Sequence, residues 1–472
     1  MTALYDTGGR RGASTGSTES HCMVKAIGFP FDLVDLHDCN PVRYPHLLQS
    51  TAHGRFDILF AFPGATLRLD PSGTMSGPPE AGPENGDFLA AFDRWWSSSS
   101  SGSSTREVLP FAGGWFVYLG YELAAQIEPC LRLPRGGDEL PVAAATRFST
   151  AIVRDHDKHA TLIVAEAGHE HRIAAIERDI IGLSRPDRRD QEAPRLARTI
   201  EAPQEYYLAA VERIHRYIRD GDVFQVNISR PWRITAREPV DAPALYRNLR
   251  RHNPAPYSGI TRWGTTAVIS SSPERLVRVR GRMVETRPIA GTRPRGHSKM
   301  IDNNRSAELL AHPKERAEHV MLIDLERNDL GRLCTPGSVE VDEFMVLESY
   351  AHVHHIVSNV KGGLRADITP GQVLRAVFPG GTITGCPKVR CMEIIAELEQ
   401  EPRGAYTGSM GYINRDGDMD MNILIRSMSV SGNQVQLRTG AGIVADSVPE
   451  AELEETRAKA LGLLRALGIS DN

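Results

Sequence analysis

Alternating apolar runs and helical repeats divide this chain into short strands and longer helices. The N-terminal half has four strand-like runs bounded by turn residues, at positions 56–60, 114–119, 151–154 and 161–165. In the C-terminal half, helices are predicted over 203–219, 389–398 and 449–467. Strands are predicted on both sides of Gly281 and at 408–414, 420–430 and 434–438. Because strands cluster around hairpin turns and helices form separate blocks, the pattern predicts an α+β fold with large antiparallel sheets flanked by helices.

The chain is long enough for more than one domain. Its 472 residues allow about two to four ordinary domains or one large interwoven domain. A polar stretch rich in Arg and Asp, residues 184–193, marks the predicted boundary. We therefore expect an N-terminal domain at 23–190 and a C-terminal domain at 195–470. Residues 1–22 are rich in Gly, Ser and Thr and are predicted to be a disordered extension.

Charge and cysteine content narrow the choice of partner and compartment. The net charge of -4 gives no reason to expect nucleic acid or an acidic membrane surface as a partner. No stretch approaches the roughly 20 apolar residues of a membrane span, and the N-terminus lacks the apolar core of a signal peptide. The six Cys include no C-x-x-C pair and no metal-type spacing. Reduced thiols in a cytoplasmic protein are the prediction.

The run from Thr286 to Gly296 alternates Arg and Pro with small residues. Each Pro fixes its own φ and biases the preceding residue toward extended geometry, a pattern that suits neither a helix nor a long strand. Three Arg side chains and two Thr hydroxyls would project from such a stiffened loop, which suits an anionic small molecule. The alternative is an ordinary basic surface loop.

Two predicted helices each carry a pair of carboxylates at a spacing of three. Glu315 and Glu318 form one pair, and Glu452 and Glu455 form the other, with Lys459 four residues further on the same side. Carboxylate oxygens are the ligands that Mg²⁺ prefers, so two such helices facing each other would make a four-carboxylate cage. The alternative is a pair of solvated helix faces.

Two loops and one histidine are further candidates for a ligand site. Residues 378–388 pack Gly, Pro and Thr ahead of the helix at 389–398, and a loop at a helix N-terminus suits an anion. Residues 439–444 contain a Gly-x-Gly that would let the backbone approach a carboxylate closely. His355 is a candidate general acid or base, with a structural histidine as the alternative.

Together these motifs resemble one family, the chorismate-using enzymes, which include anthranilate, aminodeoxychorismate, isochorismate and salicylate synthases. The resemblance runs from about residue 200 to the end, in nine blocks at 222–229, 271–276, 287–296, 315–332, 352–357, 378–398, 406–412, 420–426 and 440–455. The N-terminal half is more loosely similar to the matching domain of anthranilate synthase component I. The resemblance implies a chorismate-binding catalytic domain at 195–470 and sheets that form a sandwich-like core.

The resemblance also implies a role for each motif. Glu318 and Glu455 match direct Mg²⁺ ligands, whereas Glu315 and Glu452 match residues that hold its waters. Glu274 matches a proposed general acid/base. Thr382 and His355 are implied to line the site around the reacting ring. Substrate binding, largely through the two carboxylates, is implied for Tyr406, Arg426, Gly440, Gly442, Lys459 and Thr292.

The residue at position 225 bears on which nucleophile attacks chorismate. Water-using members of the family carry a Lys base at this position, and Gln is a poor base, so the resemblance implies ammonia as the nucleophile. Uncharged ammonia is scarce at neutral pH, and no glutaminase with a nucleophilic Cys is visible in this chain. A separate glutamine amidotransferase subunit that supplies ammonia is therefore the implied partner.

The residues that distinguish the two ammonia-using reactions point to different products. Many aminodeoxychorismate synthases have a Lys at Ala290 that attacks the ring, whereas anthranilate synthases have Ala, as here. Asn227 and the loop at 380–385 are more similar to the aminodeoxychorismate branch. The balance favours 4-amino-4-deoxychorismate, for p-aminobenzoate and folate synthesis, with either direct attack by ammonia or another nucleophile. Lys388 is the nearest such candidate, although a role in ordering its own loop competes.

Two alternatives remain open. One is anthranilate with pyruvate, for tryptophan synthesis, and the other is a non-catalytic chorismate-binding subunit. Residues 47–50 and 253–258 are similar to segments associated with tryptophan feedback. They depart from those segments at Gln49, where Glu is usual, and at Ser258, where Met is usual.

Overall fold

The computed structural model describes most of the chain. It covers residues 22–52, 54–82, 86–100, 109–134, 136, 139–183, 192–295, 298–349 and 353–469. The predicted extension at 1–22 therefore lies outside the described residues, apart from Cys22. No helix in the described ranges is long and apolar enough to cross a membrane.

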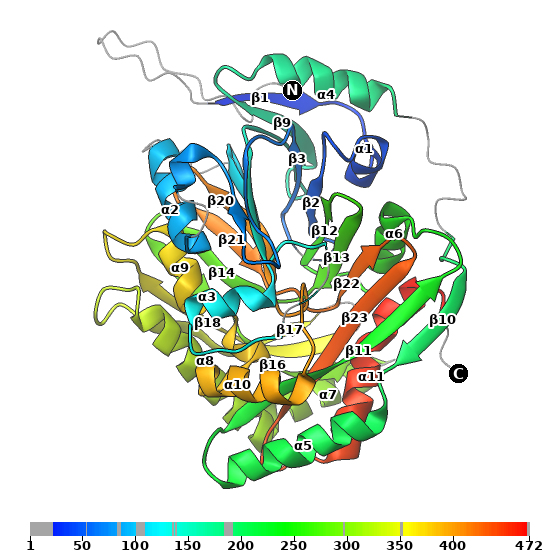
Figure 1. The fold of residues 1–472 in the computed structure, drawn as a ribbon, viewed down its shortest axis with the longest axis vertical. Helices are drawn as coiled ribbons and strands as arrows, with labels where there is room; N and C mark the ends of the chain where they lie inside the picture. Colours follow the sequence, from blue (N-terminus) through cyan, green and yellow to red (C-terminus); the bar gives the residue numbers. More distant parts are fainter. Residues whose placement is uncertain are drawn as a thin grey trace.

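Two large antiparallel sheets, seen together in Figure 1, form the body of the protein. The first sheet has twelve strands among the described residues. In spatial order they are β1 (Cys22–Ile27), β9 (Ala160–Glu166), β8 (Thr150–Asp155), β3 (Phe56–Ala61), β2 (His46–Gln49), β12 (Tyr257–Trp263), β13 (Thr266–Ser272), β22 (Ser427–Ser431), β23 (Gln434–Ile443), β11 (Gln225–Ala236) and β10 (Leu196–Glu201), with β19 (Gly385–Cys386) also paired to β11.

The second sheet has eleven strands among the described residues. In spatial order they are β16 (Ile289–Pro294), β18 (Val353–Gly363), β15 (Met283–Thr286), β14 (Arg275–Arg280), β21 (Met419–Asn422), β20 (Ser409–Asn414), β6 (Gly114–Leu119), β7 (Ala143–Phe148), β4 (Thr66–Leu69) and β5 (Met75–Ser76), with β17 (Glu340–Ser349) also paired to β18. The predicted antiparallel α+β architecture is confirmed.

Helices cover the outer faces of both sheets (Figure 1). Their bounds are α1 (Leu33–Cys39), α2 (Phe88–Ser99), α3 (Ala124–Ile127), α4 (His171–Ile181), α5 (Gln204–Arg219), α6 (Ala242–His252), α7 (Lys299–Ala311), α8 (Pro313–Gly331), α9 (Pro370–Val377), α10 (Lys388–Glu399) and α11 (Pro449–Ala466), with short 3-10 turns at Pro79–Ala81, Tyr121–Leu123 and Gly381–Ile383. The predicted helices at 203–219, 389–398 and 449–467 are confirmed as α5, α10 and α11.

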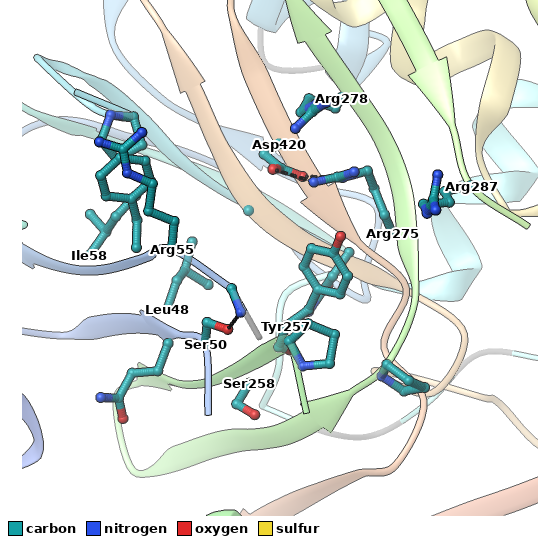
Figure 2. A pocket seen from close by; sticks show the side chains of 18 of the residues that line it. Leu48, Ser50, Arg55, Ile58, Tyr257, Ser258, Arg275, Arg278, Arg287 and Asp420 are labelled. Atoms are coloured by element: carbon teal, nitrogen blue, oxygen red, sulfur yellow. Dashed lines mark hydrogen bonds and ion pairs between the residues drawn. The ribbon is translucent and has the colours of Figure 1, made fainter. Parts of the chain in front are cut away.

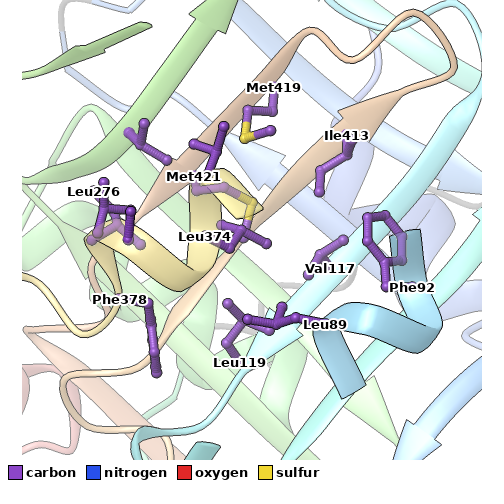
Figure 3. Close-up of a cluster of buried hydrophobic side chains, with 14 of the residues drawn as sticks. Leu89, Phe92, Val117, Leu119, Leu276, Leu374, Phe378, Ile413, Met419 and Met421 are labelled. Atoms are coloured by element: carbon purple, nitrogen blue, oxygen red, sulfur yellow. The ribbon is translucent and has the colours of Figure 1, made fainter. Parts of the chain in front are cut away.

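The sandwich follows from strands that are apolar on both faces. In β6, Phe116 and Tyr118 point toward the first sheet, where they pack with Phe60 of β3. Val117 and Leu119 point to the opposite face, under α2 and α9 (Figure 3). Because successive side chains of a strand alternate between faces, one strand contributes to the core between the sheets and to the core beneath the helices.

Each sheet consists of one block of strands from the N-terminal half and one block from the C-terminal half, joined side by side. Ile260 of β12 pairs with Leu47 of β2 in the first sheet, and Ile413 of β20 pairs with Trp115 of β6 in the second. The two halves thus share their backbone hydrogen bonding. The division at 190–195 stays a prediction, because residues 184–191 lie outside the described part.

Two local predictions were wrong. The run from Thr286 to Gly296 was expected to form a stiffened loop, but Ile289–Pro294 within it forms the short strand β16, paired with β18 and interrupted by a register shift at Gly291. Edge pairing tolerates Pro and a bulge, which explains the difference. The expected strand over 420–430 is broken into β21 and β22, which belong to different sheets. The chain turns between them, with Arg426 at φ 52°.

Candidate active site

A buried carboxyl group and a hydroxyl group form the centre of the predicted chemistry. Glu274 lies between β13 and β14 and is 6% exposed, and the Thr382 hydroxyl donates a hydrogen bond of 2.7 Å to its Oε1. Burial raises the pKa of Glu274 to about 7, although Thr382 and the charge of Lys459 act in the opposite direction. A carboxyl group with a pKa near neutrality can both hold and release a proton, as general acid/base chemistry requires.

Four residues predicted to bind substrate lie together beside this pair. Lys459 Nζ donates to the Gly440 carbonyl at 2.9 Å and forms an ion pair with Glu455 at 2.6 Å. Arg426 Nη1 donates to the Lys459 carbonyl at 3.2 Å. A Cβ on Gly440 would lie 3.0 Å from the Tyr406 hydroxyl, so only Gly leaves this space open. Two cations and a phenol thus lie close together, a grouping of the kind that binds carboxylates.

Gln225 and Gly442 lie diagonally across the neighbouring strands β11 and β23, where Gly442 is paired with Asn227. A Cβ on Gly442 would lie 2.2 Å from Gln225 Nε2, so the side-chain amide occupies the space that Gly442 leaves. Gly442 and Gly440 are two residues apart and share one face of β23, the face toward Tyr406. Gln225 Oε1 is buried and, among the described residues, has no hydrogen-bond partner.

His355 and Ala290 lie on the adjoining strands β18 and β16. Burial first, and the charge of Arg426 second, lower the pKa of His355 to about 4, so the imidazole is neutral at pH 7. Ala290 is 8% exposed and pairs with Ile356. At Gly291 φ is +63°, a backbone conformation that favours Gly, and a Cβ there would also lie 2.9 Å from Glu315 Oε2. Thr292 pairs with His355 in the ladder, but its side chain is not among those described.

Comparisons with known proteins show the family to which the chain belongs. The model of the chorismate binding enzyme family matches residues 44–465, nearly the whole chain. The chain belongs to this family. Aminodeoxychorismate synthase component 1 of Bacillus subtilis (strain 168) is 40% identical over 435 residues, which cover 90% of this chain and 92% of the relative. Anthranilate synthase component 1 of Thermus thermophilus is 43% identical over 366 residues, covering 77% of this chain and 79% of the relative.

Solved structures of the family share the fold. Anthranilate synthase component I from Streptococcus pneumoniae TIGR4 superposes with a TM-score of 0.76 at 31% identity, covering 87% of this chain and 92% of that chain. MenF, the menaquinone-specific isochorismate synthase from Escherichia coli, superposes with a TM-score of 0.70 at 20% identity, over 94% of each chain, and this likeness concerns the fold alone. The chain is thus a chorismate-binding enzyme with the expected sandwich of antiparallel sheets.

The four carboxylates predicted to hold Mg²⁺ in this chorismate-binding enzyme lie on two helices. Glu315 and Glu318 are on α8, where Glu315 forms an ion pair with Arg293 at 3.0 Å. Glu452 and Glu455 are on α11. Within the described ranges no group of three or more His, Cys, Asp or Glu is arranged to hold a metal, so the four-carboxylate cage is not assembled here. Their role as metal ligands stays a prediction.

The arginines of the predicted anion-binding run are paired with carboxylates instead. Arg287 forms an ion pair with Glu343 and another with Glu348, each at 2.6 Å. Arg295 forms one with Asp302 at 2.7 Å. Together with the pair between Arg293 and Glu315, these contacts engage all three guanidinium groups. The expectation that they project toward an anionic ligand is not met in this structure.

Lys388 lies at the start of α10 and is occupied by its surroundings. Its Nζ forms an ion pair with Asp329 at 2.5 Å and donates to the Val377 carbonyl at 3.2 Å. These bonds join α10 to α8 and to the end of α9. The geometry favours the loop-ordering role over the alternative of a nucleophile.

A cavity between the two sheets is lined by a different set of side chains (Figure 2). It measures about 650 Å³, and its lining residues include Gln49, Tyr257, Ser258, Arg275 and Asp420. None of the predicted catalytic or substrate-binding side chains lines it. The two segments similar to tryptophan-feedback segments, at 47–50 and 253–258, thus meet at one cavity, as their shared resemblance suggests.

The sequence did not reveal one buried ion-pair cluster behind the site. Glu399 at the end of α10 accepts bonds from Arg403 and Arg438, and its side chain is 2% exposed. Glu399 and Arg403 are four residues apart in the sequence, but Arg403 lies beyond the end of α10, so helical spacing does not predict the pair. Only the fold shows that this one is buried.

Proposed function

We propose that this chorismate-binding enzyme transfers an amino group from ammonia to chorismate, giving 4-amino-4-deoxychorismate for p-aminobenzoate and folate synthesis. The observation that carries the proposal is the buried pair of Glu274 and Thr382 beside the cluster of Tyr406, Arg426 and Lys459. It joins a proton donor to a clamp for two carboxylates, which is what the departure of a hydroxyl from a dicarboxylate needs. The Bacillus relative named above supports the choice of product.

Glu274 is the proton donor in this proposal. With a pKa of about 7, its carboxyl group is substantially protonated at neutral pH and can pass the proton to the hydroxyl that leaves the ring as water. The Thr382 hydroxyl fixes the carboxyl group and stabilises the carboxylate that remains. Lys459, Arg426 and Tyr406 hold the substrate carboxylates, so the ring is oriented before the proton moves.

Ammonia is the nucleophile in this proposal and replaces the hydroxyl directly, because Ala290 offers no amine. Gln225 Oε1 supports this role, since it is a buried acceptor without a described partner. An unsatisfied buried acceptor costs about 1–3 kcal/mol, and an N–H of ammonia would relieve that cost. We propose a separate glutamine amidotransferase subunit as the source of ammonia.

Mg²⁺ completes the proposed site. Glu318 and Glu455 would bind the ion directly, and Glu315 and Glu452 would hold its waters. When bound, the ion offsets the charge of the substrate and polarises the groups that it contacts. Glu315 and Glu455 are ion-paired with Arg293 and Lys459 in the structure, so those pairs would open or reorganise as the ion binds.

Anthranilate synthesis is the second candidate function. Ala290 favours it, as do relatives such as the Thermus anthranilate synthase component 1 at 43% identity. Turnover of chorismate with Mg²⁺ and ammonium, followed by assay of pyruvate, separates the two. The proposal requires chorismate to be consumed without pyruvate. It also requires that glutamine alone, without an amidotransferase subunit, gives no turnover, and a chain that binds chorismate without consuming it would be a non-catalytic subunit.

A further inference from the structure

Behind the proposed site, three charged side chains form a buried cluster. Glu399 accepts from Arg403 Nη2 at 2.7 Å and Nε at 3.0 Å, and from Arg438 Nη2 at 2.9 Å. Arg403 is 4% exposed and Arg438 is 7% exposed. Burial acts to raise the pKa of Glu399, but the two guanidinium groups outweigh it and hold this pKa below its usual range. Both arginines therefore compensate the buried negative charge of Glu399.

Arg403 makes additional bonds that the structure does not give to Arg438. Its Nη2 donates to the Asn227 carbonyl at 2.7 Å, and its Nη1 donates to the Ile383 carbonyl at 3.2 Å. Asn227 is two residues from Gln225 in β11, and Ile383 directly follows Thr382. One guanidinium group thus bonds both to the backbone of β11 near Gln225 and to the backbone of the loop that carries Thr382.

Arg403 is itself held in place from two directions. Its guanidinium group lies 4.9 Å from the ring centre of Tyr121 and 5.6 Å from that of Tyr406. Its backbone N–H donates to Glu122 at 2.7 Å. Tyr121 and Glu122 belong to the N-terminal half, whereas Tyr406 is a predicted contact to substrate. The position of Arg403 is therefore set by both halves of the chain.

We propose that Arg403 is a positioning residue that fixes Thr382, the Gln225–Asn227 segment and Tyr406 relative to one another. The proposal rests on the proposed function, because it assigns the site's catalytic geometry to this one side chain. A guanidinium group has five N–H donors in a planar fork and can reach a carboxylate and two carbonyls at once. A Lys ammonium has three donors on one nitrogen and cannot span them. Arg403 acts through its neighbours and does not itself touch substrate.

The test compares Arg403→Lys with the matched control Arg438→Lys. Both variants keep a positive charge beside Glu399 and lose part of its hydrogen bonding, so we expect both to lower the denaturation midpoint, Arg403→Lys by more because it also loses the bonds to the Asn227 and Ile383 carbonyls. Only Arg403→Lys loosens the Thr382 loop from β11. We expect it to lower kcat by about 10- to 100-fold with a much smaller change in KM, since small misplacements of reacting groups cost that much. Arg438→Lys should keep kcat close to that of the unaltered chain.

Equal kinetic effects of the two variants, or an unchanged kcat for Arg403→Lys, would overturn the proposal. If Arg403→Lys does not fold, Tyr121→Leu keeps the guanidinium group and its bonds to Glu399 but removes the ring packed on it. That variant should lower kcat less, in the same direction, and an unchanged kcat would again overturn the proposal. The comparison uses whichever aromatic or amino product the unaltered chain makes. Formation of anthranilate by the unaltered chain would thus refute the proposed function and leave the role of Arg403 to be decided by the variants.

Discussion

Replacing Thr382 by Val tests the proton chemistry of Glu274 most closely. Val has nearly the shape of Thr but removes the 2.7 Å hydrogen bond to Glu274 Oε1. That bond lowers the pKa of Glu274, so its loss must raise the pKa above its value of about 7. A hydrogen bond to a charged group contributes about 1.5–3 kcal/mol, and one pKa unit corresponds to about 1.4 kcal/mol. We expect the pKa to rise by about one to two units.

The assay is the pH profile of kcat/KM for chorismate, with uncharged ammonia held constant by adjusting total ammonium at each pH. A general acid loses activity as pH rises through its pKa, so the descending limb should move from near pH 7 to higher pH in Thr382→Val. Thr384→Val is the control, because its hydroxyl donates to the Gly380 carbonyl and not to Glu274. A limb that stays in place in Thr382→Val, or moves as far in Thr384→Val, would refute the assignment of Glu274 as the acid.

Three further predictions concern other parts of the site. Glu274→Gln should become more stable relative to the unaltered chain as pH rises from 5 to 8. The raised folded-state pKa of about 7 means that Glu274 stabilises the unaltered chain at low pH, and this stabilisation is lost as pH rises through that pKa. Urea unfolding should show a relative gain of about 2–3 kcal/mol in the free energy of unfolding of Glu274→Gln, and a difference independent of pH would contradict the prediction. Glu318→Ala and Glu455→Ala should each abolish Mg²⁺-dependent turnover while circular dichroism shows an intact fold, and undiminished turnover would remove the residue from the metal site. Lys388→Arg should keep the ion pair with Asp329 and most of the turnover, whereas complete loss of turnover in a folded variant would favour Lys388 as the nucleophile.

Residues close together in sequence were placed well by pattern. The helical spacing that linked Glu452, Glu455 and Lys459 is confirmed by α11, and the hairpin around Gly281 is confirmed by β14 and β15. In each case the interaction is local, so periodicity and turn chemistry are sufficient to predict it. The motif at 439–444 was placed correctly beside Lys459 through the family resemblance, because spacing alone does not bring a strand and a helix together.

Interactions between segments that are distant in the sequence could not be predicted from it. Arg287 was expected to face a ligand, but Glu343 and Glu348 approach it from β17, a strand whose position depends on the whole second sheet. The break at Arg426 places β21 and β22 in different sheets, and no Gly or Pro marks it. Spacing likewise put Glu315 and Glu318 on one face of α8 without fixing the distance from α8 to α11. Pairing and packing over long separations decide these features.

Identification of the product formed from chorismate, Mg²⁺ and ammonium tests the central claim most directly. Chromatography with mass detection, combined with an enzymatic assay for pyruvate, follows both candidate reactions in one sample. The account predicts 4-amino-4-deoxychorismate with no release of pyruvate. Fluorescent anthranilate that accumulates in step with pyruvate would contradict it and would identify Ala290 as the better guide to the reaction than Asn227 and the loop at 380–385.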